Sequence, residues 1–409
     1  MNNRNLISIS LVALMLFAAG CAEKTSTGIK ITGITPLATP ASAPAGEPNI
    51  CATPEGGALL SWVEKDTTNK ISTLKYSNWQ NNSWSEAKTI AQGSDWFVNW
   101  ADFPALAVQE DGRLFASWLV KSAASTYAYD VTLSQSNDGG KLWSEPFSPH
   151  DDKTPTEHGF VSMQPLSNGN FAVSWLDGRE MVEDGPMTLR FATFNAAGEV
   201  TNQALLDNKV CDCCQTSMTI AGDGSVLVAY RDRSDDEIRD MSIVRFADSV
   251  WSNPVSISDD DWHIAGCPVN GPALSASKSL VAASWFTMGT DSKARVLCAF
   301  SNDFGKSFNP PIRIDTGEPL GRVDIVFIDE NIALVSWLET VENKTRIAAR
   351  TVGSDGTLSE VVTVAETLPS RSSGFARMGI TSDGVIIAWT DVGDSPVVKS
   401  SLILIQSSQ

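Results

Sequence analysis

Long apolar runs are absent from this 409-residue chain once its first twenty residues are set aside. A helix that crosses a bilayer needs about 20 consecutive apolar residues, so the rest of the chain is not expected to span a membrane. Positive charge is also scarce, because 30 Lys and Arg stand against 48 Asp and Glu and give a formal net charge of −18. An acidic surface repels phosphates. The composition therefore argues against nucleic acids and anionic lipids as partners.

The first twenty residues have the pattern of an export signal. Arg4 supplies a positive start, residues 6–17 are apolar, and small residues precede Cys21. Residues 18–21 resemble a bacterial lipobox, which implies cleavage before Cys21 and lipidation of its thiol; an ordinary secretory signal is the alternative. Ala22 after the cysteine implies, by the same resemblance, the outer membrane. We expect a cell-envelope protein that meets the membrane only through this N-terminal lipid.

Seven short apolar segments that each end in a bulky aromatic recur along the chain, 52 to 57 residues apart. The aromatics are Trp62, Trp118, Trp175, Tyr230, Trp285, Trp337 and Trp389. A period near fifty with strand-like segments is typical of a radial array in which each repeat packs only against its neighbours. The repeat predicts an all-β protein, a seven-bladed β-propeller of four-stranded antiparallel blades.

The repeat also sets the domain boundaries. Residues 1–20 are the signal, residues 21–47 hold the lipidated N-terminus, a strand-like run and a Pro/Ala-rich linker, and residues 48–409 form one propeller domain. The last unit has only three strands before the chain stops. We therefore expect residues 30–37 to pair as its missing outer strand and to close the ring.

Two turns between third and fourth strands carry the pattern S-x-D-x-G-x-x-W/F, at residues 136–143 and 301–308. Their Asp caps backbone N–H groups of a tight turn and their Gly takes a conformation that other residues resist. The pattern resembles the Asp box of the sialidase superfamily (BNR repeats). The resemblance implies a propeller fold, with six blades as the alternative count, and it gives the boxes themselves a structural role.

The sialidase mechanism is not matched by the residues. By resemblance, the family's hydrolases bind the substrate carboxylate with an arginine triad and use a late tyrosine nucleophile activated by Glu, with an Asp acid/base. Here no arginine lies between Arg4 and Arg113, and no tyrosine follows Tyr230. Without a phenolate to form the glycosyl intermediate, we expect little or no sialidase activity.

Polar residues gather on one predicted face, where first strands start and second strands end. The candidate ligand-binding residues there are His158, Asp177, Arg179, Arg231, Asp232, Arg233, Asn270, Arg322 and Asp324. Arginine forks match carboxylate geometry, so this set is a candidate clamp in the central funnel of blades 3–6. For the segment around Arg231 and Arg233, an ion-paired surface loop is the alternative.

Cysteines form the most unusual local feature. Cys211, Cys213 and Cys214 are predicted at the start of an innermost strand, and Cys267 enters at the same level one blade later. Thiolates suit copper or zinc. In an exported chain the alternative is one or two disulfides, for example Cys267 with Cys213 or Cys214.

Three functions follow from these residues. The first is an exported, monomeric lipoprotein that binds a glycan, a small molecule such as an anion, or a protein in the funnel. The second is a divergent glycoside hydrolase of sialidase type, or a lyase, that uses carboxylates such as Asp177, Asp232, Asp324 or Glu339. The third is a copper or zinc protein, or a redox protein, centred on the cysteines.

Overall fold

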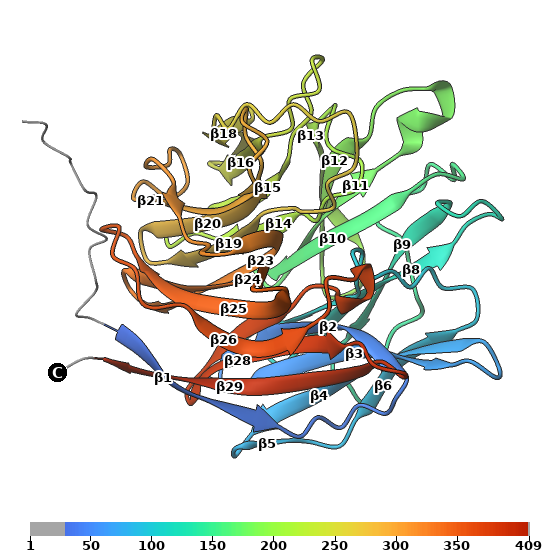
Figure 1. The fold of residues 1–409 in the computed structure, drawn as a ribbon. Coiled ribbons are helices and arrows are strands. Elements are labelled where there is room, and N and C mark those ends of the chain that lie inside the picture. Colours follow the sequence, from blue (N-terminus) through green and yellow to red (C-terminus); the bar gives the residue numbers. More distant parts are fainter. Residues whose placement is uncertain (1–28, 408–409) are drawn as a thin grey trace, which may run out of the picture.

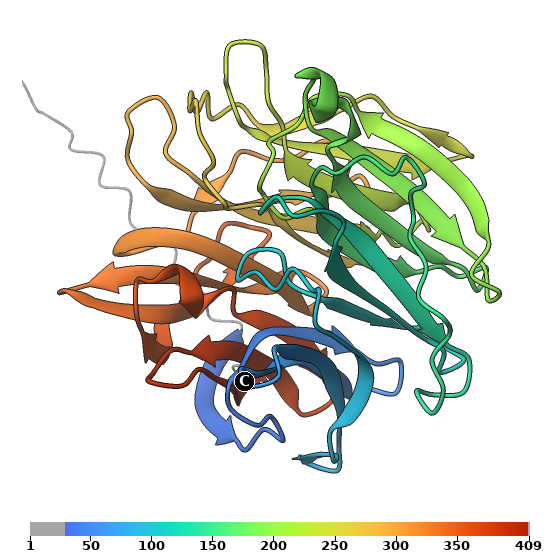
Figure 2. The ribbon, with the colours of Figure 1, turned by 90° about the vertical axis from the view of Figure 1, so that its right-hand side faces the viewer.

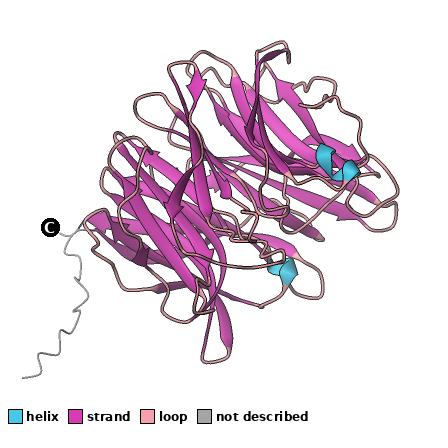
Figure 3. Cartoon of the chain, turned by 90° about the horizontal axis from the view of Figure 1, so that it is seen from above, coloured by secondary structure: helices cyan, strands magenta, loops and turns pink. Residues whose placement is uncertain are grey.

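The computed structural model describes residues 29–407, which form seven antiparallel sheets arranged in a ring (Figure 1). The predicted signal and Cys21 lie outside the described residues. Strands dominate, and the helices of the described part are two short 3₁₀ turns, Arg179–Glu183 and Arg371–Ser373 (Figure 3). No helix of the described part is long and apolar enough to cross a membrane. The predicted seven-bladed β-propeller is confirmed.

The blades follow one another in chain order, and each runs outward from its first strand. Blade 1 contains β2 (Ala45–Ala52), β3 (Ala58–Asp66), β4 (Ile71–Gln80), β5 (Ser83–Trp84) and β6 (Lys88–Gly93). Blade 2 contains β7 (Ala105–Val108), β8 (Leu114–Lys121) and β9 (Tyr129–Ser136). Blade 3 contains β10 (His158–Pro165), β11 (Phe171–Asp177), β12 (Thr188–Phe194) and β13 (Val200–Asp207). Blade 4 contains β14 (Ser217–Ile220), β15 (Val226–Arg231), β16 (Met241–Ala247), β17 (Val250–Trp251) and β18 (Val255–Ser258). Blade 5 contains β19 (Ala273–Ser277), β20 (Leu280–Thr287), β21 (Arg295–Ser301) and β22 (Ile312–Arg313). Blade 6 contains β23 (Glu318–Asp329), β24 (Ile332–Val341), β25 (Lys344–Gly353) and β26 (Val362–Thr367). Blade 7 contains β27 (Arg377–Thr381), β28 (Gly384–Asp391), β29 (Val397–Ser407) and β1 (Ile29–Leu37).

Blade 7 is closed by both ends of the described chain. β1 pairs antiparallel with β29 along its whole length, and Figure 1 shows the blue and red strands side by side. Ile31 and Ile34 pack against the apolar core between blades 6 and 7. This is the closure that the sequence predicts. The first blade begins at Ala45, three residues before the predicted boundary at residue 48.

Blade 2 has three strands rather than the expected four. Only an isolated bridge between Leu133 and Phe147 marks the fourth position. Pro146 and Pro149 flank Phe147, and proline has no N–H to donate to a ladder. The segment that follows β9 is therefore free to cross the face of the ring as a loop.

The core is divided among the blade interfaces. Seven apolar clusters are found, one between each pair of neighbouring blades, and the second strands are buried on both sides. Trp62, Trp285 and Trp337 of the repeated position are fully buried. Figure 2 shows the sheets stacked as successive layers around the ring. Each blade thus buries its apolar side chains only against its two neighbours.

The two Asp boxes have the expected structural geometry. Ser136 Oγ donates to Asp138 Oδ1 at 2.8 Å and accepts from the Gly140 N–H at 2.8 Å. The same two contacts recur around Asp303, from Ser301 at 2.7 Å and from Gly305 at 2.8 Å. These turns leave the ends of third strands, so they lie on the face opposite the ends of second strands. We call the face with the Asp boxes the lower face and the other the upper face.

Candidate functional site

The upper face gathers part of the predicted set in blade 3. His158 begins β10 and pairs in register with Asp177, the last residue of β11. Arg179 Nε donates to Asp177 Oδ1 at 2.7 Å, and Arg179 Nη2 donates to Asp177 Oδ2 at 2.8 Å. Both His158 and Asp177 are fully buried, whereas Arg179 is partly exposed. Strand ends thus bring three of the nine candidates together.

Three more residues of this cluster come from segments that the sequence reasoning did not single out. Asp130 is the second residue of β9, and His150 and Asp152 lie in the loop after blade 2. Asp152 Oδ1 is 3.3 Å from Arg179 Nη2 and 2.9 Å from His150 Nδ1. The only signal for them is the run of residues 150–152, and no strand pattern indicates where that loop lies.

The charges around Asp177 determine its ionisation. Burial alone would raise the pKa of its carboxyl, but the bidentate hydrogen bonds from Arg179 and the nearby His158 hold the pKa below its usual range. Trp175 Nε1 also donates to Asp177 Oδ2 at 2.8 Å. Asp177 is therefore an anchored carboxylate that orients Arg179, and it is poorly suited to be a general acid.

A pocket of about 240 Å³ opens beside this cluster, between blades 2 and 3. It is lined by Pro149, His150, Asp151, Trp175, Arg179, Arg190, Phe191 and residues 203–205. Arg190 makes ion pairs at 3.7 Å with Asp177 and with Glu180, and its Nε has no hydrogen-bond partner among the described residues. The unpaired Nε is itself buried, so any donor that Arg190 offers to a ligand has to come from the terminal nitrogens of its guanidinium.

The central channel is a second cavity, of about 370 Å³, lined by the first strands of all seven blades. Asp324 is in its wall, where its carboxylate is 3.2 Å from Arg377 Nη1 and accepts the Met378 N–H at 2.6 Å. Phe103 and Phe375 lie at the upper end, where their ring centroids are 5.8 Å apart. These aromatics narrow the funnel that the sequence predicts to be the ligand site.

Tyr129 joins two carboxyl groups at the upper end of this channel. Its hydroxyl oxygen lies 2.5 Å from Glu157 Oε1 and 3.2 Å from Asp102 Oδ2. A phenol has one proton, so it can donate to only one carboxylate, and the other carboxyl must be protonated to donate back. Burial raises the pKa of Asp102 to about 8 and that of Glu157 to about 7. Asp102, which lines the channel, has the higher pKa of the two carboxyls.

Arg231 occupies the interior rather than the funnel. It is 1 % exposed, and its guanidinium donates to the backbone carbonyls of Asn270, Arg239 and Phe286 at 2.6 to 3.0 Å. It also stacks over the Trp262 ring at 4.8 Å. Its expected role as a ligand clamp does not fit this geometry, because its hydrogen-bonding capacity is used by the backbone.

Arg233 and Asp232 belong to the ion-paired loop that the sequence left as an alternative. Arg233 Nη2 lies 2.7 Å from Glu237 Oε1, and its Nη1 lies 3.1 Å from Asp212 Oδ1. Asp232 accepts from the Ser242 hydroxyl at 3.0 Å. The charged side chains of this segment are therefore paired with other groups of blade 4.

Asn270 and Arg322 also hold the scaffold. Asn270 Oδ1 accepts the Arg322 N–H at 2.7 Å, and Arg322 Nη1 donates to the Gly374 carbonyl at 3.2 Å. Arg322 stacks over Trp100 at 4.8 Å, and burial lowers the pKa of its guanidinium to about 10. These contacts tie blades 5, 6 and 7 together below the upper surface.

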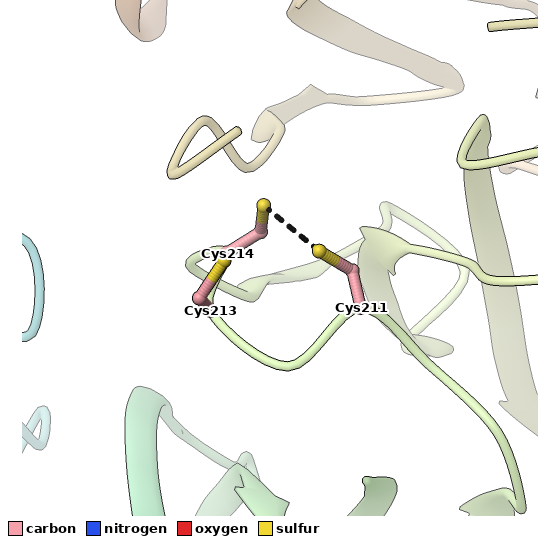
Figure 4. Close-up of side chains that lie close together, drawn as sticks. All are labelled: Cys211, Cys213 and Cys214. Atoms are coloured by element: carbon pink, nitrogen blue, oxygen red, sulfur yellow. Dashed lines mark hydrogen bonds between the residues drawn. The ribbon is translucent and has the colours of Figure 1, made fainter. Parts of the chain in front are cut away.

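The cysteines divide into a disulfide and a dithiol. Cys213 is bonded to Cys267 across 54 residues, so two of the four sulfurs proposed as metal ligands are already joined. Cys211 Sγ lies 3.3 Å from Cys214 Sγ, the contact drawn as a dashed line in Figure 4. The cluster lies in the loop before β14, ahead of the strand that the sequence predicts to hold it.

The environment of Cys211 favours its thiolate. The hydrogen bond from Cys214 and the nearby charges of Arg231 and Arg239 lower the pKa of Cys211 to about 6, although burial acts in the opposite direction. Arg239 Nη1 lies 3.4 Å from Cys211 Sγ. Burial raises the pKa of Cys214 well above its usual range. Cys298 is buried as expected, whereas Cys51 is only half-buried.

Comparison with known proteins agrees with this architecture. Residues 64–244 match the family model of the BNR repeat-like domain. A lectin from Burkholderia pseudomallei is 14 % identical, with a TM-score of 0.58 over 93 % of this chain and 97 % of the lectin. The α-L-arabinofuranosidase Arb93A from Fusarium graminearum is 12 % identical, with a TM-score of 0.51 over 93 % of this chain and 98 % of the enzyme. A protein of unknown function from Dyadobacter fermentans is 14 % identical, with a TM-score of 0.52 over 92 % and 99 %.

No curated protein sequence matches the chain. At these identities the structural neighbours establish the fold alone. The repeat of seven blades, the paired Asp boxes and the matched family model agree with one another. The chain is therefore a seven-bladed β-propeller with two Asp boxes, and its residues 64–244 are similar to the BNR repeat-like domain.

Proposed function

We propose that this protein is an exported, lipid-anchored propeller that binds a glycan in the pocket between blades 2 and 3. The observation that carries the proposal is Arg190, whose partly exposed guanidinium borders the pocket and makes only two ion pairs at 3.7 Å. The export signal and Cys21 support the location at the cell envelope.

The charge of the pocket favours a carbohydrate over a free anion. Arg179, Arg190 and Asp151 line it, and the carboxylates of Asp152 and Glu180 pair with the two arginines beside it. An anion would face these carboxylates at short range, whereas sugar hydroxyls both donate and accept hydrogen bonds. Two structural neighbours are named as a lectin and an α-L-arabinofuranosidase, which supports the same class of ligand.

The test is binding of the purified full chain to an array of neutral and acidic glycans, followed by calorimetry on any hit. We expect Arg190→Ala to weaken binding at least ten-fold. Arg113→Ala is the matched control, because Arg113 is a partly buried arginine paired with Asp111 in a turn of the lower face. No glycan binding, or an equal loss in both variants, would reject the proposal.

A second candidate is a divergent glycoside hydrolase or lyase acting in the channel. It is favoured by one observation, the buried Asp102 in the channel wall 3.2 Å from the Tyr129 hydroxyl, because burial raises its pKa to about 8 and a carboxyl with a raised pKa can act as a general acid. The test is release of reducing ends or unsaturated sugars from a panel of polysaccharides. Asp102→Asn should abolish the turnover, and absence of turnover by the unaltered chain would exclude this candidate.

A further inference from the structure

The three side chains Asp130, His150 and His158 converge on one point at the upper face, between blades 2 and 3. One ligand atom from each lies within 4.8 Å of the other two. Asp130 Oδ1 is 3.4 Å from His158 Nδ1 and 4.0 Å from His150 Nε2. Two ligands of one tetrahedral zinc are about 3.3 Å apart when each bond is about 2.0 Å, so the three atoms are near coordination distances. The two imidazoles are stacked, with centroids 4.0 Å apart and planes 10° apart, so one ring must rotate before both lone pairs point at one ion.

The same three atoms lack hydrogen bonds, as does His158 Nε2. Asp130 Oδ1, His150 Nε2 and His158 Nδ1 are buried and have no hydrogen-bond partner among the described residues. The side chains of His158 and His150 are 0 % and 3 % exposed, respectively. Leaving buried polar atoms without partners costs free energy. A cation at the point where they converge would satisfy all three at once.

The opposite nitrogens of both imidazoles face the Asp152 carboxylate. His150 Nδ1 lies 2.9 Å from Asp152 Oδ1, and His158 Nε2 lies 3.2 Å from Asp152 Oδ2. A hydrogen on His150 Nδ1 would face Asp152 and leave the lone pair of His150 Nε2 free. His158 Nε2 is near the same carboxylate but makes no hydrogen bond to it, so the His158 ring has to turn to gain the same orientation. Metal-binding histidines are commonly oriented in this way by a carboxylate behind them. Asp177 lies 3.7 Å from His158 Nε2 and adds to this outer layer.

We propose that Asp130, His150 and His158 bind a divalent transition metal, zinc first among them. Two imidazole nitrogens and one carboxylate oxygen are ligands that zinc accepts, and three protein ligands leave a fourth position for water or a ligand atom. The Asp130 side chain is 34 % exposed, although its Oδ1 and the two histidine nitrogens are themselves buried. Asp152 is a positioning residue for both imidazoles. This site is separate from the cysteine loop and does not depend on glycan binding.

The test is metal content and calorimetric zinc binding of the full chain purified without chelator. We expect one zinc per chain, a rise in melting temperature on zinc addition, and a cobalt-substituted form with a visible absorption spectrum. His150→Ala should weaken zinc binding more than 100-fold and abolish both the melting shift and the spectrum. Asp152→Asn should weaken binding about 10- to 100-fold while retaining the site.

Two controls separate this site from others. His263→Ala removes an exposed histidine elsewhere on the chain and should leave zinc binding unchanged. A Cys211→Ser, Cys214→Ser double variant should also keep it, because the cysteine loop is not part of the site. Circular dichroism establishes that each variant is folded. The proposal is overturned if the unaltered chain binds no zinc, or if folded His150→Ala binds zinc with unchanged affinity and melting shift.

Discussion

At the scale of single residues, Arg231 shows how a charged side chain can support a propeller from within. Its donors satisfy carbonyls of Asn270 and Phe286 in blade 5 and of Arg239 in blade 4. The guanidinium therefore replaces backbone hydrogen bonds at a place where two sheets diverge. Such a residue resembles a ligand clamp in the sequence, because both roles call for an arginine close to the end of a second strand.

Replacement of Arg231 should be costly. Arg231→Met leaves three buried carbonyls without donors, and unsatisfied buried groups cost about 1–3 kcal/mol each. We expect a loss of about 3–5 kcal/mol in the free energy of unfolding, measured by urea denaturation. The control is Lys344→Met, whose exposed pair with Glu366 should be worth about 0.5 kcal/mol or less. A loss below about 1 kcal/mol for Arg231→Met would contradict the assigned role.

Cys211 should titrate alone near neutral pH. Its pKa is lowered to about 6, whereas burial raises the pKa of Cys51 to about 12 and raises those of Cys214 and Cys298 as well. We expect one thiolate step in the ultraviolet absorbance centred near pH 6, absent in Cys211→Ser. Cys214→Ala should move the midpoint upward, because it removes the thiol that donates to the thiolate.

The same shift predicts a pH dependence of stability. The native pKa of Cys211 lies below its ordinary value of 9.0, so its thiolate stabilises the fold fully above pH 9. That contribution declines as the pH falls toward 6 and is lost below it. Unfolding measured from pH 9 to pH 5 should show a decline that Cys211→Ser lacks. Equal slopes in the two proteins would argue against a native thiolate.

At the scale of elements, the strand that closes the ring contributes both backbone pairing and apolar packing to blade 7. β1 covers the outer edge of β29, and Ile34 packs into the core between blades 6 and 7. Without β1 that edge would expose unpaired backbone groups and apolar side chains. Ring closure thus depends on a strand that is first in the chain and last in its blade.

Substitutions in β1 test this closure. Ile34→Asp should lower the free energy of unfolding by at least about 2 kcal/mol, because it exchanges a packed apolar side chain for a charge. Thr35→Asp introduces the same charge at the neighbouring exposed position and should have little effect. Deletion of residues 29–37 should lower the melting temperature further. An unchanged melting temperature after the deletion would show that the ring does not need this strand.

At the scale of the whole molecule, periodicity predicts more than chemistry does. The spaced aromatics predict seven blades, and the incomplete last unit predicts the closure, because both depend only on strand order. The missing fourth strand of blade 2 depends on Pro146 and Pro149, and their effect is local. The repeat therefore assigns each residue to a blade and to the upper or lower end of its strand. That was enough to predict that His158 and Asp177 lie together.

The repeat does not predict the direction in which a side chain points. Arg179 and Arg231 each lie at or just beyond the end of a second strand, yet one reaches a pocket and the other fills the interior. The difference comes from neighbouring loops, such as the one that brings His150 against His158, and loops have no period. His150 and Asp152 were missed for this reason, whereas Asp130 lies on a third strand, and only the ends of first and second strands were expected to carry the site. The positions of His150 and Asp152 depend on the course of the loop between β9 and β10, which the sequence pattern does not predict.

The pairing of β1 with β29 also sets the order in which the protein can mature. Ile34 meets Ile403, so the contact that seals the ring cannot form until the chain has been synthesised as far as β29. Until then blades 1 and 7 each keep an open side, a state in which multistrand proteins are prone to misassembly. A chain truncated before β29 would keep its first strand but have no partner for it. An unfinished molecule is therefore distinguished from a complete one by a single unpaired strand.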